Sequence, residues 1–173
     1  HGNTYWSDPD VRGGGIYCLN NASPVFRDII LRHNYSERDG AGMYNNSSAP
    51  SLYNVTFENN TAEALGGGMS NRLSNPIIVG ATFSGNHAGY GGGMYNDGSN
   101  PSIQAAVFED NTASLNSGGM SNWFTSSPYL KGVDFVNNSS GTYGGAIMNY
   151  NSSPIMEEVL ISDNTSAEGG GMY

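Results

Sequence analysis

The sequence predicts an all-β fold, a parallel β-solenoid with about 26 residues per coil and about six coils. Three observations support this prediction. One set of residues recurs at a nearly constant spacing, each copy contains short alternating apolar segments typical of strands, and no segment has the period of an amphipathic helix. Because a unit of this length cannot bury its own apolar side, the copies are expected to stack on one another.

The repeat is visible in four columns that run from Gly13 to Tyr173. An apolar residue follows a small-residue triplet, a proline comes later, a large apolar residue stands seven positions after the proline, and an asparagine stands three further on. The columns are Ile16, Met43, Met69, Met94, Met120, Ile147 and Met172; Pro24, Pro50, Pro76, Pro101, Pro128 and Pro154; Leu31, Phe57, Phe83, Phe108, Phe135 and Ile161; and Asn34, Asn60, Asn86, Asn111, Asn138 and Asn164. Only the spacing outside the proline-to-asparagine segment varies, as expected of strands joined by variable loops.

Each repeat predicts two or three short strands, as the copy from Gly91 to Asn111 illustrates. Pro101 opens a strand, where its missing N–H does least harm, and Ile103, Ala106 and Phe108 are its apolar positions. The odd step between Ile103 and Ala106 predicts a bend or bulge. The glycine–methionine segment predicts a second strand, and the polar tract after the asparagine a third side or turn. Residues 1–12 lie outside the register and are predicted to be a cap or linker before the repeat domain of residues 13–173.

The columns also assign the core and two ladders of asparagines. The predicted core residues are Met43, Met69, Met94, Met120, Phe57, Phe83, Phe108 and Phe135. The predicted ladder residues are Asn34, Asn60, Asn86, Asn111, Asn138 and Asn164 in one column, and Asn45, Asn71, Asn96, Asn122 and Asn149 in the other. At a turn, an asparagine side chain can bond the backbone and its equivalents in neighbouring coils, so a structural role is favoured over a catalytic one. Cys18 occupies the second column in the first coil and predicts a small buried thiol.

Two groups of residues are candidates for surface roles. Tyr17, Tyr44, Tyr95 and Tyr173 follow the methionine column and are expected to project outward, as a stripe for sugar stacking or side-by-side packing. The sequons at Asn21, Asn46, Asn54 and Asn151 fall at turns or strand edges and are candidate glycosylation sites in a secreted form.

Composition and charge exclude several functions. The net charge of −9 makes nucleic acid an unsuitable partner, and the basic residues Arg12, Arg27, Arg32 and Arg38 form no repeated column, which favours a solvated face or an end cap. No apolar run is long enough to span a membrane. The single cysteine and scattered histidines provide no predicted metal site or cofactor site.

The sequence predicts no active site, so the chain is expected not to be an enzyme. Asp110 and Asp163 are equivalent positions two coils apart, and a carboxylate pair could serve glycoside hydrolysis. They nevertheless fall in a repeat column, and the chain contains no GHG or RIK segment of the galacturonase type.

With these columns in hand, the sequence resembles the repeats of the chlamydial polymorphic outer-membrane proteins, whose motifs are GGA[ILV] and FxxN. The segment Gly144–Ile147 matches the first motif literally, and Phe57–Asn60, Phe83–Asn86, Phe108–Asn111 and Phe135–Asn138 match the second. More widely, the sequence is similar to bacterial right-handed parallel β-helix repeat proteins. The resemblance spans residues 13–173 and implies a right-handed β-helix in a surface-exposed or secreted protein, such as an adhesin or an autotransporter passenger.

These observations favour a non-enzymatic extracellular module with a structural or adhesive role at the cell surface, whose partners are surface glycans or proteins. A subunit of a filament that assembles head to tail, with the chain itself as partner, is the alternative, because open coils present unpaired edges. A carbohydrate-active enzyme of the pectinase-like β-helix type is the third hypothesis. The chain opens on His1 and stops at Tyr173 within a repeat, so a mature product or part of a longer chain is expected.

Overall fold

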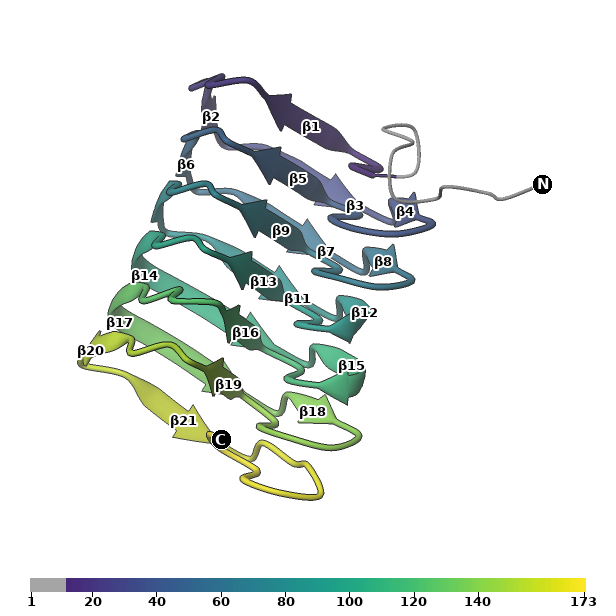
Figure 1. The fold of residues 1–173 in the computed structure, drawn as a ribbon, viewed down its shortest axis with the longest axis vertical. Helices are drawn as coiled ribbons and strands as arrows, with labels where there is room; N and C mark the ends of the chain where they lie inside the picture. The colour runs from purple at the N-terminus through teal and green to yellow at the C-terminus, as the bar shows by residue number, and fades with distance from the viewer. Residues whose placement is uncertain (1–11) are drawn as a thin grey trace.

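The computed structural model describes residues 12–173, which form an all-β parallel β-solenoid with coils about 26 residues apart. Seen from its N-terminal end, the chain winds clockwise as it recedes, so the solenoid is right-handed, as predicted (Figure 1). Of the predicted cap or linker at residues 1–12, only Arg12 lies within the described residues.

Three parallel sheets form the sides of the solenoid, each built from one segment of every coil. The first sheet has six strands and contains the methionine column, with Met94 in register with Met69 and Met120. Its strands, in order, are β1 (Ile16–Leu19), β5 (Met43–Asn46), β9 (Met69–Arg72), β13 (Met94–Asp97), β16 (Met120–Trp123) and β19 (Ile147–Tyr150). Alternation along each strand places the methionines inward and the residues after them on the outer face.

The second sheet follows the prolines and contains the phenylalanine column. Its strands are β2 (Val25–Arg27), β3 (Ile30–Arg32), β6 (Ser51–Tyr53), β7 (Thr56–Glu58), β10 (Ile77–Val79), β11 (Thr82–Ser84), β14 (Ser102–Glu109), β17 (Tyr129–Val136), β20 (Ile155–Glu157) and β21 (Leu160–Ser162). The predicted bend lies four residues after each proline, where the backbone has positive φ, for example at Gly80, Ala105 and Gly132. The positive φ at this residue explains why the inward-facing apolar positions on either side of it are three residues apart, as at Ile103 and Ala106, and not two.

The third sheet is formed by the polar tract that follows each ladder asparagine. Its strands are β4 (Tyr35–Ser36), β8 (Thr61–Ala62), β12 (His87–Tyr90), β15 (Thr112–Asn116) and β18 (Ser139–Ser140). A small satellite core of Ala41, Ala62 and Ala88 lies beneath this side. The glycines then carry the chain back into the first sheet.

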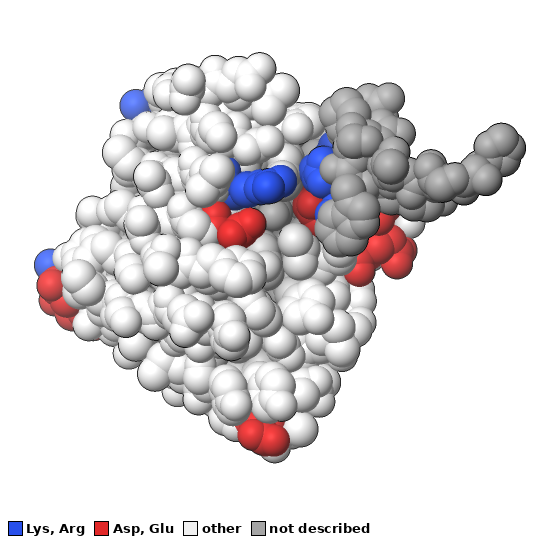
Figure 2. Space-filling model, viewed as in Figure 1, with Lys and Arg blue, Asp and Glu red and all other residues white. Residues whose placement is uncertain are grey.

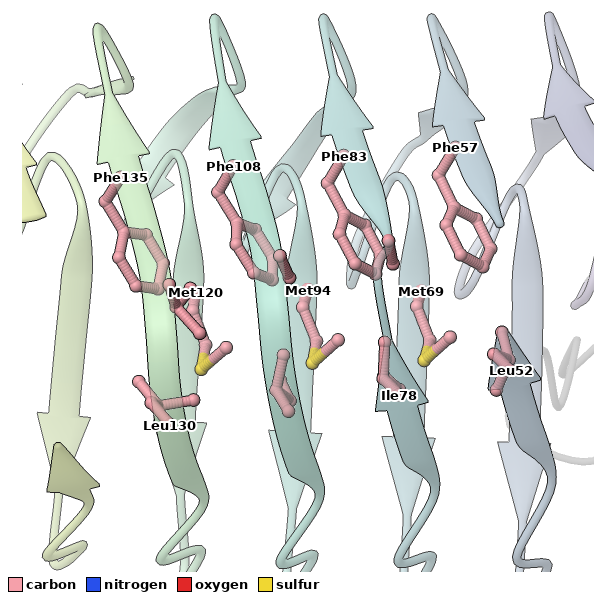
Figure 3. Packing of buried hydrophobic residues seen from close by; sticks show 14 of the residues in the cluster. Leu52, Phe57, Met69, Ile78, Phe83, Met94, Phe108, Met120, Leu130 and Phe135 are labelled. Atoms are coloured by element: carbon pink, nitrogen blue, oxygen red, sulfur yellow. The ribbon is translucent and has the colours of Figure 1, made fainter. Parts of the chain in front are cut away.

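The core is a set of ladders of identical side chains, and the predicted methionines and phenylalanines are all fully buried. Figure 3 shows Phe57, Phe83, Phe108 and Phe135 in a row, with the methionines of the opposite sheet facing them. The rings of Phe83 and Phe108 are parallel to within 3° with their centroids 4.4 Å apart, about the separation of adjacent strands. The stacking therefore follows from the register of the coils.

The first asparagine ladder is confirmed and ties three coils together at each step. Asn86 Oδ1 accepts from both the backbone N–H and the side-chain amide of Asn60, each at 3.0 Å. Its Nδ2 donates to the Phe57 carbonyl and to Asn111 Oδ1, both at 2.9 Å. The same pattern recurs along the column, so these amides pair backbone groups that the corner would otherwise leave without partners.

The second ladder is also confirmed, from Asn45 through Asn71, Asn96 and Asn122 to Asn149, with each Nδ2 donating to the Oδ1 of the next coil at 2.8–2.9 Å. Cys18 is in register with Asn45 and buried, as predicted from its column. Because a thiol stands where an amide would donate, Asn45 Oδ1 is buried with no hydrogen-bond partner among the described residues.

A third ladder, of serines, was not predicted from the sequence. The backbone N–H groups of Ser48, Ser74 and Ser99 donate to the hydroxyl oxygen of the serine one coil further on, at 2.9–3.0 Å. Each serine stands two residues before a proline, and this regular position was the available signal. The ladder fixes the corner that leads into the second sheet.

Candidate binding pocket

The tyrosines after the methionine column do not form the exposed stripe that the sequence predicts. They face away from the core, but Tyr44 is only 2% exposed and Tyr95 only 7% exposed. Tyr17 is partly buried, and Tyr173, in the last coil, is the one half-exposed member of the four. The prediction considered only the alternation of the strand and omitted neighbouring residues that cover the rings.

The covering residues come from the turn that precedes each strand of the first sheet. The residue four positions before the methionine column pairs in parallel with its equivalents, as Asp39 does with Arg12 and Leu65 through isolated bridges. The turn at Gly40, with φ of +62°, brings Asp39 against β5, and a Cβ on Gly40 would lie only 2.8 Å from Tyr44 Cβ. Glycine is needed there because the two segments approach so closely.

A pocket of about 340 Å³ opens on this face where the tyrosine column is interrupted. Ser70 takes the place of tyrosine in β9, while Tyr44 of β5 and Tyr95 of β13 line the pocket from the two adjacent coils. The remaining lining residues are Arg12, Arg38, Asp39, Leu65, Asn71, Arg72 and Asp97. A small side chain in one coil therefore leaves a cavity between two aromatic rings.

Asp39 is the most unusual group in the pocket. Asp39 is 3% exposed. Its Oδ2 accepts a hydrogen bond from Arg12 Nε–H at 3.0 Å and lies 3.4 Å from Arg38 Nε. Its other oxygen, Oδ1, is buried and has no hydrogen-bond partner among residues 12–173. Burial raises the pKa of the Asp39 carboxyl group, with the two arginines opposing the shift. A buried acceptor without a donor is costly.

Basic residues gather around this pocket in an otherwise acidic protein. Arg12, Arg38 and Arg72 are three of the six lysines and arginines in the chain. The sequence predicts a solvated face or an end cap for these arginines; Arg12 and Arg38 do not form a solvated face, because both side chains are largely buried in ion pairs with Asp39. Arg72 is half-exposed, with its Nε 3.9 Å from Asp97. Figure 2 shows basic and acidic atoms side by side on this face, amid a mostly uncharged surface.

An exposed aromatic cluster lies on the same sheet, near its C-terminal edge. Trp123 of β16 and Tyr150 of β19 are in register with ring centroids 4.9 Å apart, and Phe124 is within 6.3 Å of both rings. Phe124 is 55% exposed and Tyr150 is 47% exposed. The aromatic contact surface expected at Tyr44 and Tyr95 is thus found two columns further along the strands, at the residues that end them.

The other candidate residues are scattered over the coils. Asn21, Asn54 and Asn151 are exposed and Asn46 is partly buried, and their glycosylation stays a prediction. Asp110 is exposed and accepts a hydrogen bond from Asn137 of the next coil, so it takes part in a polar row at that corner. Within residues 12–173 there is no group of three or more histidine, cysteine, aspartate or glutamate side chains that could hold a metal ion.

The described part of the chain, residues 12–173, contains no helix long and apolar enough to cross a membrane. No curated protein and no solved structure matches the chain. The Chlamydia polymorphic membrane protein repeat family matches residues 132–150, which run from the second half of β17 to the end of β19. This segment contains both the Phe135–Asn138 and the Gly144–Ile147 motifs. Part of one coil of the solenoid therefore matches the repeat of a family of surface-associated outer-membrane proteins.

Proposed function

We propose that this chain is a non-enzymatic module of a cell-surface protein and that it adheres to surface glycans or proteins through the outer face of its first sheet. The observation that carries the proposal is the aromatic cluster of Trp123, Phe124 and Tyr150. Large aromatic side chains supply much contact area for little conformational entropy, and such residues dominate binding surfaces. The repeat match to a surface protein family supports the proposed location.

The repeat itself provides matched variants for a test. Phe124 has φ of 51°, and Asn151 occupies the equivalent position of the next coil with φ of 49°, so Phe124→Asn should keep the turn. Tyr150→Asn installs the residue found at the equivalent position in β5, Asn46. Leu73→Asn is the control, because Leu73 is equivalent to Phe124, has φ of 48° and is 63% exposed.

The assay is binding of the fluorescently labelled chain to a glycan array and to cultured animal cells. We expect saturable binding that the double variant Phe124→Asn/Tyr150→Asn reduces at least tenfold and that Leu73→Asn leaves unchanged. Equal binding by the double variant and the control would refute the role of the aromatic cluster. Absence of binding to both targets would refute the adhesive function. Filament assembly and glycoside hydrolysis stay predictions.

A further inference from the structure

The aromatic cluster lies in a part of the chain that carries no charge. The sequence has no lysine, arginine, aspartate or glutamate in residues 111–130 or in residues 135–156, the two segments that supply the cluster. Figure 2 shows the resulting uncharged surface over β16 and β19. Asp97 of β13 is in register with Trp123, but its carboxylate lies 3.9 Å from Arg72 Nε, and this ion pair adds no net charge. The cluster is therefore complementary to a ligand without net charge.

The exposed part of the cluster is a corner made by two rings. Phe124 is 55% exposed and Tyr150 is 47% exposed, and their rings stand at 83° to each other with centroids 6.3 Å apart. Trp123 is partly buried beside both rings, and its Nε1–H donates to Ser121 Oγ at 2.9 Å. The corner is thus supported from the sheet. A small rigid ring can lie on one face with its edge against the other, and little side-chain freedom is lost on binding.

The backbone that presents Phe124 is strained. Phe124 and the following Thr125 both have positive φ, 51° and 66°, which is uncommon for a bulky residue and more so for a β-branched one. In the first coil the two consecutive residues with positive φ are Asn20 and Asn21, a residue type that tolerates this conformation. Strain of this kind concentrates at binding sites. It favours a role in recognition, and not only in packing, for the exposed ring of Phe124.

We propose that this corner binds a neutral pyranose residue of a surface glycan, an inference that rests on the proposed function and names its ligand class. One C–H face of the sugar packs on the rings. Its hydroxyl groups meet the exposed polar side chains of Thr125 and Asn151, which directly follow Phe124 and Tyr150. A charged ligand finds no counter-charge in these segments, and an apolar side chain of a protein partner would leave the polar rim without partners. A neutral sugar satisfies both the rings and the rim.

The probe is methyl β-D-glucoside, in NMR titrations of the full chain. All its ring hydroxyl groups are equatorial, so both faces of the ring present C–H bonds. Sorbitol has similar hydroxyl groups but no ring, and methyl β-D-glucuronide differs from the glucoside only in the carboxylate at C6. We expect a Kd on the order of 1–10 mM for the glucoside, at least tenfold weaker binding of sorbitol, and weaker binding of the glucuronide to this acidic chain.

Three variants and a control tie the binding to the corner. Tyr150→Asn and Phe124→Asn each remove one ring and should weaken glucoside binding at least tenfold, while Tyr150→Phe keeps the ring and should stay within about threefold of the parent chain. Leu73→Asn removes an apolar side chain that is 63% exposed at the position equivalent to Phe124, and it should bind as the parent chain does. The thermal midpoint of each variant checks that the solenoid is folded.

The outcomes separate the ligand class from the proposed function. No binding of the glucoside, equal affinity for the glucoside and sorbitol, tighter binding of the glucuronide, or equal effects of Tyr150→Asn and Leu73→Asn would each overturn the neutral-sugar site. Binding of N-acetyl-leucinamide in place of the glucoside would also overturn it, in favour of a protein partner. If the sugar site fails while Phe124→Asn/Tyr150→Asn still impairs adhesion to cells, the proposed function stands and only the ligand class is wrong.

Discussion

Replacing Asn86 with alanine tests whether the asparagine ladder stabilises the solenoid. The substitution removes four hydrogen bonds, two accepted from Asn60 and one donated to each of Phe57 and Asn111. The Asn60 N–H loses its partner and the Phe57 carbonyl loses one of its donors, while its pairing in the β7–β11 ladder remains; both residues are 0% exposed. At roughly 1–3 kcal/mol for the buried N–H left unpaired and about 0.5–1.5 kcal/mol for each other lost hydrogen bond, we expect a loss of about 2–5 kcal/mol in the free energy of unfolding.

The assay is urea unfolding followed by circular dichroism, with Asn59→Gly as the matched control. Asn59 is exposed with φ of 52°, and Gly85 fills the equivalent position of the next coil, so this change should shift the free energy of unfolding by less than about 0.5 kcal/mol. Asn86→Asp separates hydrogen bonding from packing, because it keeps the volume but removes the donor. It should be destabilised at neutral pH, where a carboxylate would face the Phe57 carbonyl and Asn111 Oδ1. A loss below about 1 kcal/mol for Asn86→Ala, or a parent-like Asn86→Asp, would refute the reasoning.

Three further predictions concern single positions. Ala105 has φ of 50° where neighbouring coils have Gly80 and Gly132, so Ala105→Gly should stabilise the chain by about 0.5–1 kcal/mol and Gly132→Ala should destabilise it similarly, measured as thermal midpoints. Burial raises the pKa of the Tyr95 phenol above its ordinary value, so its contribution to stability is complete below about pH 10 and is lost at higher pH. Between pH 9 and 11 the free energy of unfolding, measured with urea, should therefore fall by about 1 kcal/mol less in Tyr95→Phe than in the parent chain. Cys18→Asn should supply a donor to Asn45 Oδ1 and raise the free energy of unfolding by about 0.5–1.5 kcal/mol, whereas Cys18→Ala should give no gain.

The fold could be predicted from the sequence because every coil repeats the same physical constraints. The spacing from Pro101 through Phe108 to Asn111 recurs in all copies, so one reading of strand, core and corner applies to the whole chain. Parallel stacking then places equivalent residues in register, and this register produces both the phenylalanine stack and the amide ladders. The serine ladder follows the same rule, but its residues are common in loops and their column was not singled out.

The candidate site could not be predicted in the same way, because it depends on where the repeat is broken. Ser70 interrupts the tyrosine column, while Asp39 and Arg72 reach the pocket from different columns, one before the glycines and one at the end of a strand. Their proximity depends on how tightly the turn at Gly40 folds against β5. A column pattern records which residues are equivalent between coils, but not which columns meet across a turn. The burial of Tyr44 and Tyr95 was missed for this reason.

The outer face of the first sheet is the proposed binding surface, and the cluster of Trp123, Phe124 and Tyr150 is the proposed contact on it. The most direct test is an NMR titration of the ¹⁵N-labelled chain with a glycan that the array shows to be bound. We expect saturable shifts of the amide signals of Trp123, Phe124 and Tyr150, with the signals of β11 (Thr82–Ser84) unchanged. Shifts on the second sheet alone, or none at a saturating concentration of the glycan, would contradict the proposed role of the cluster.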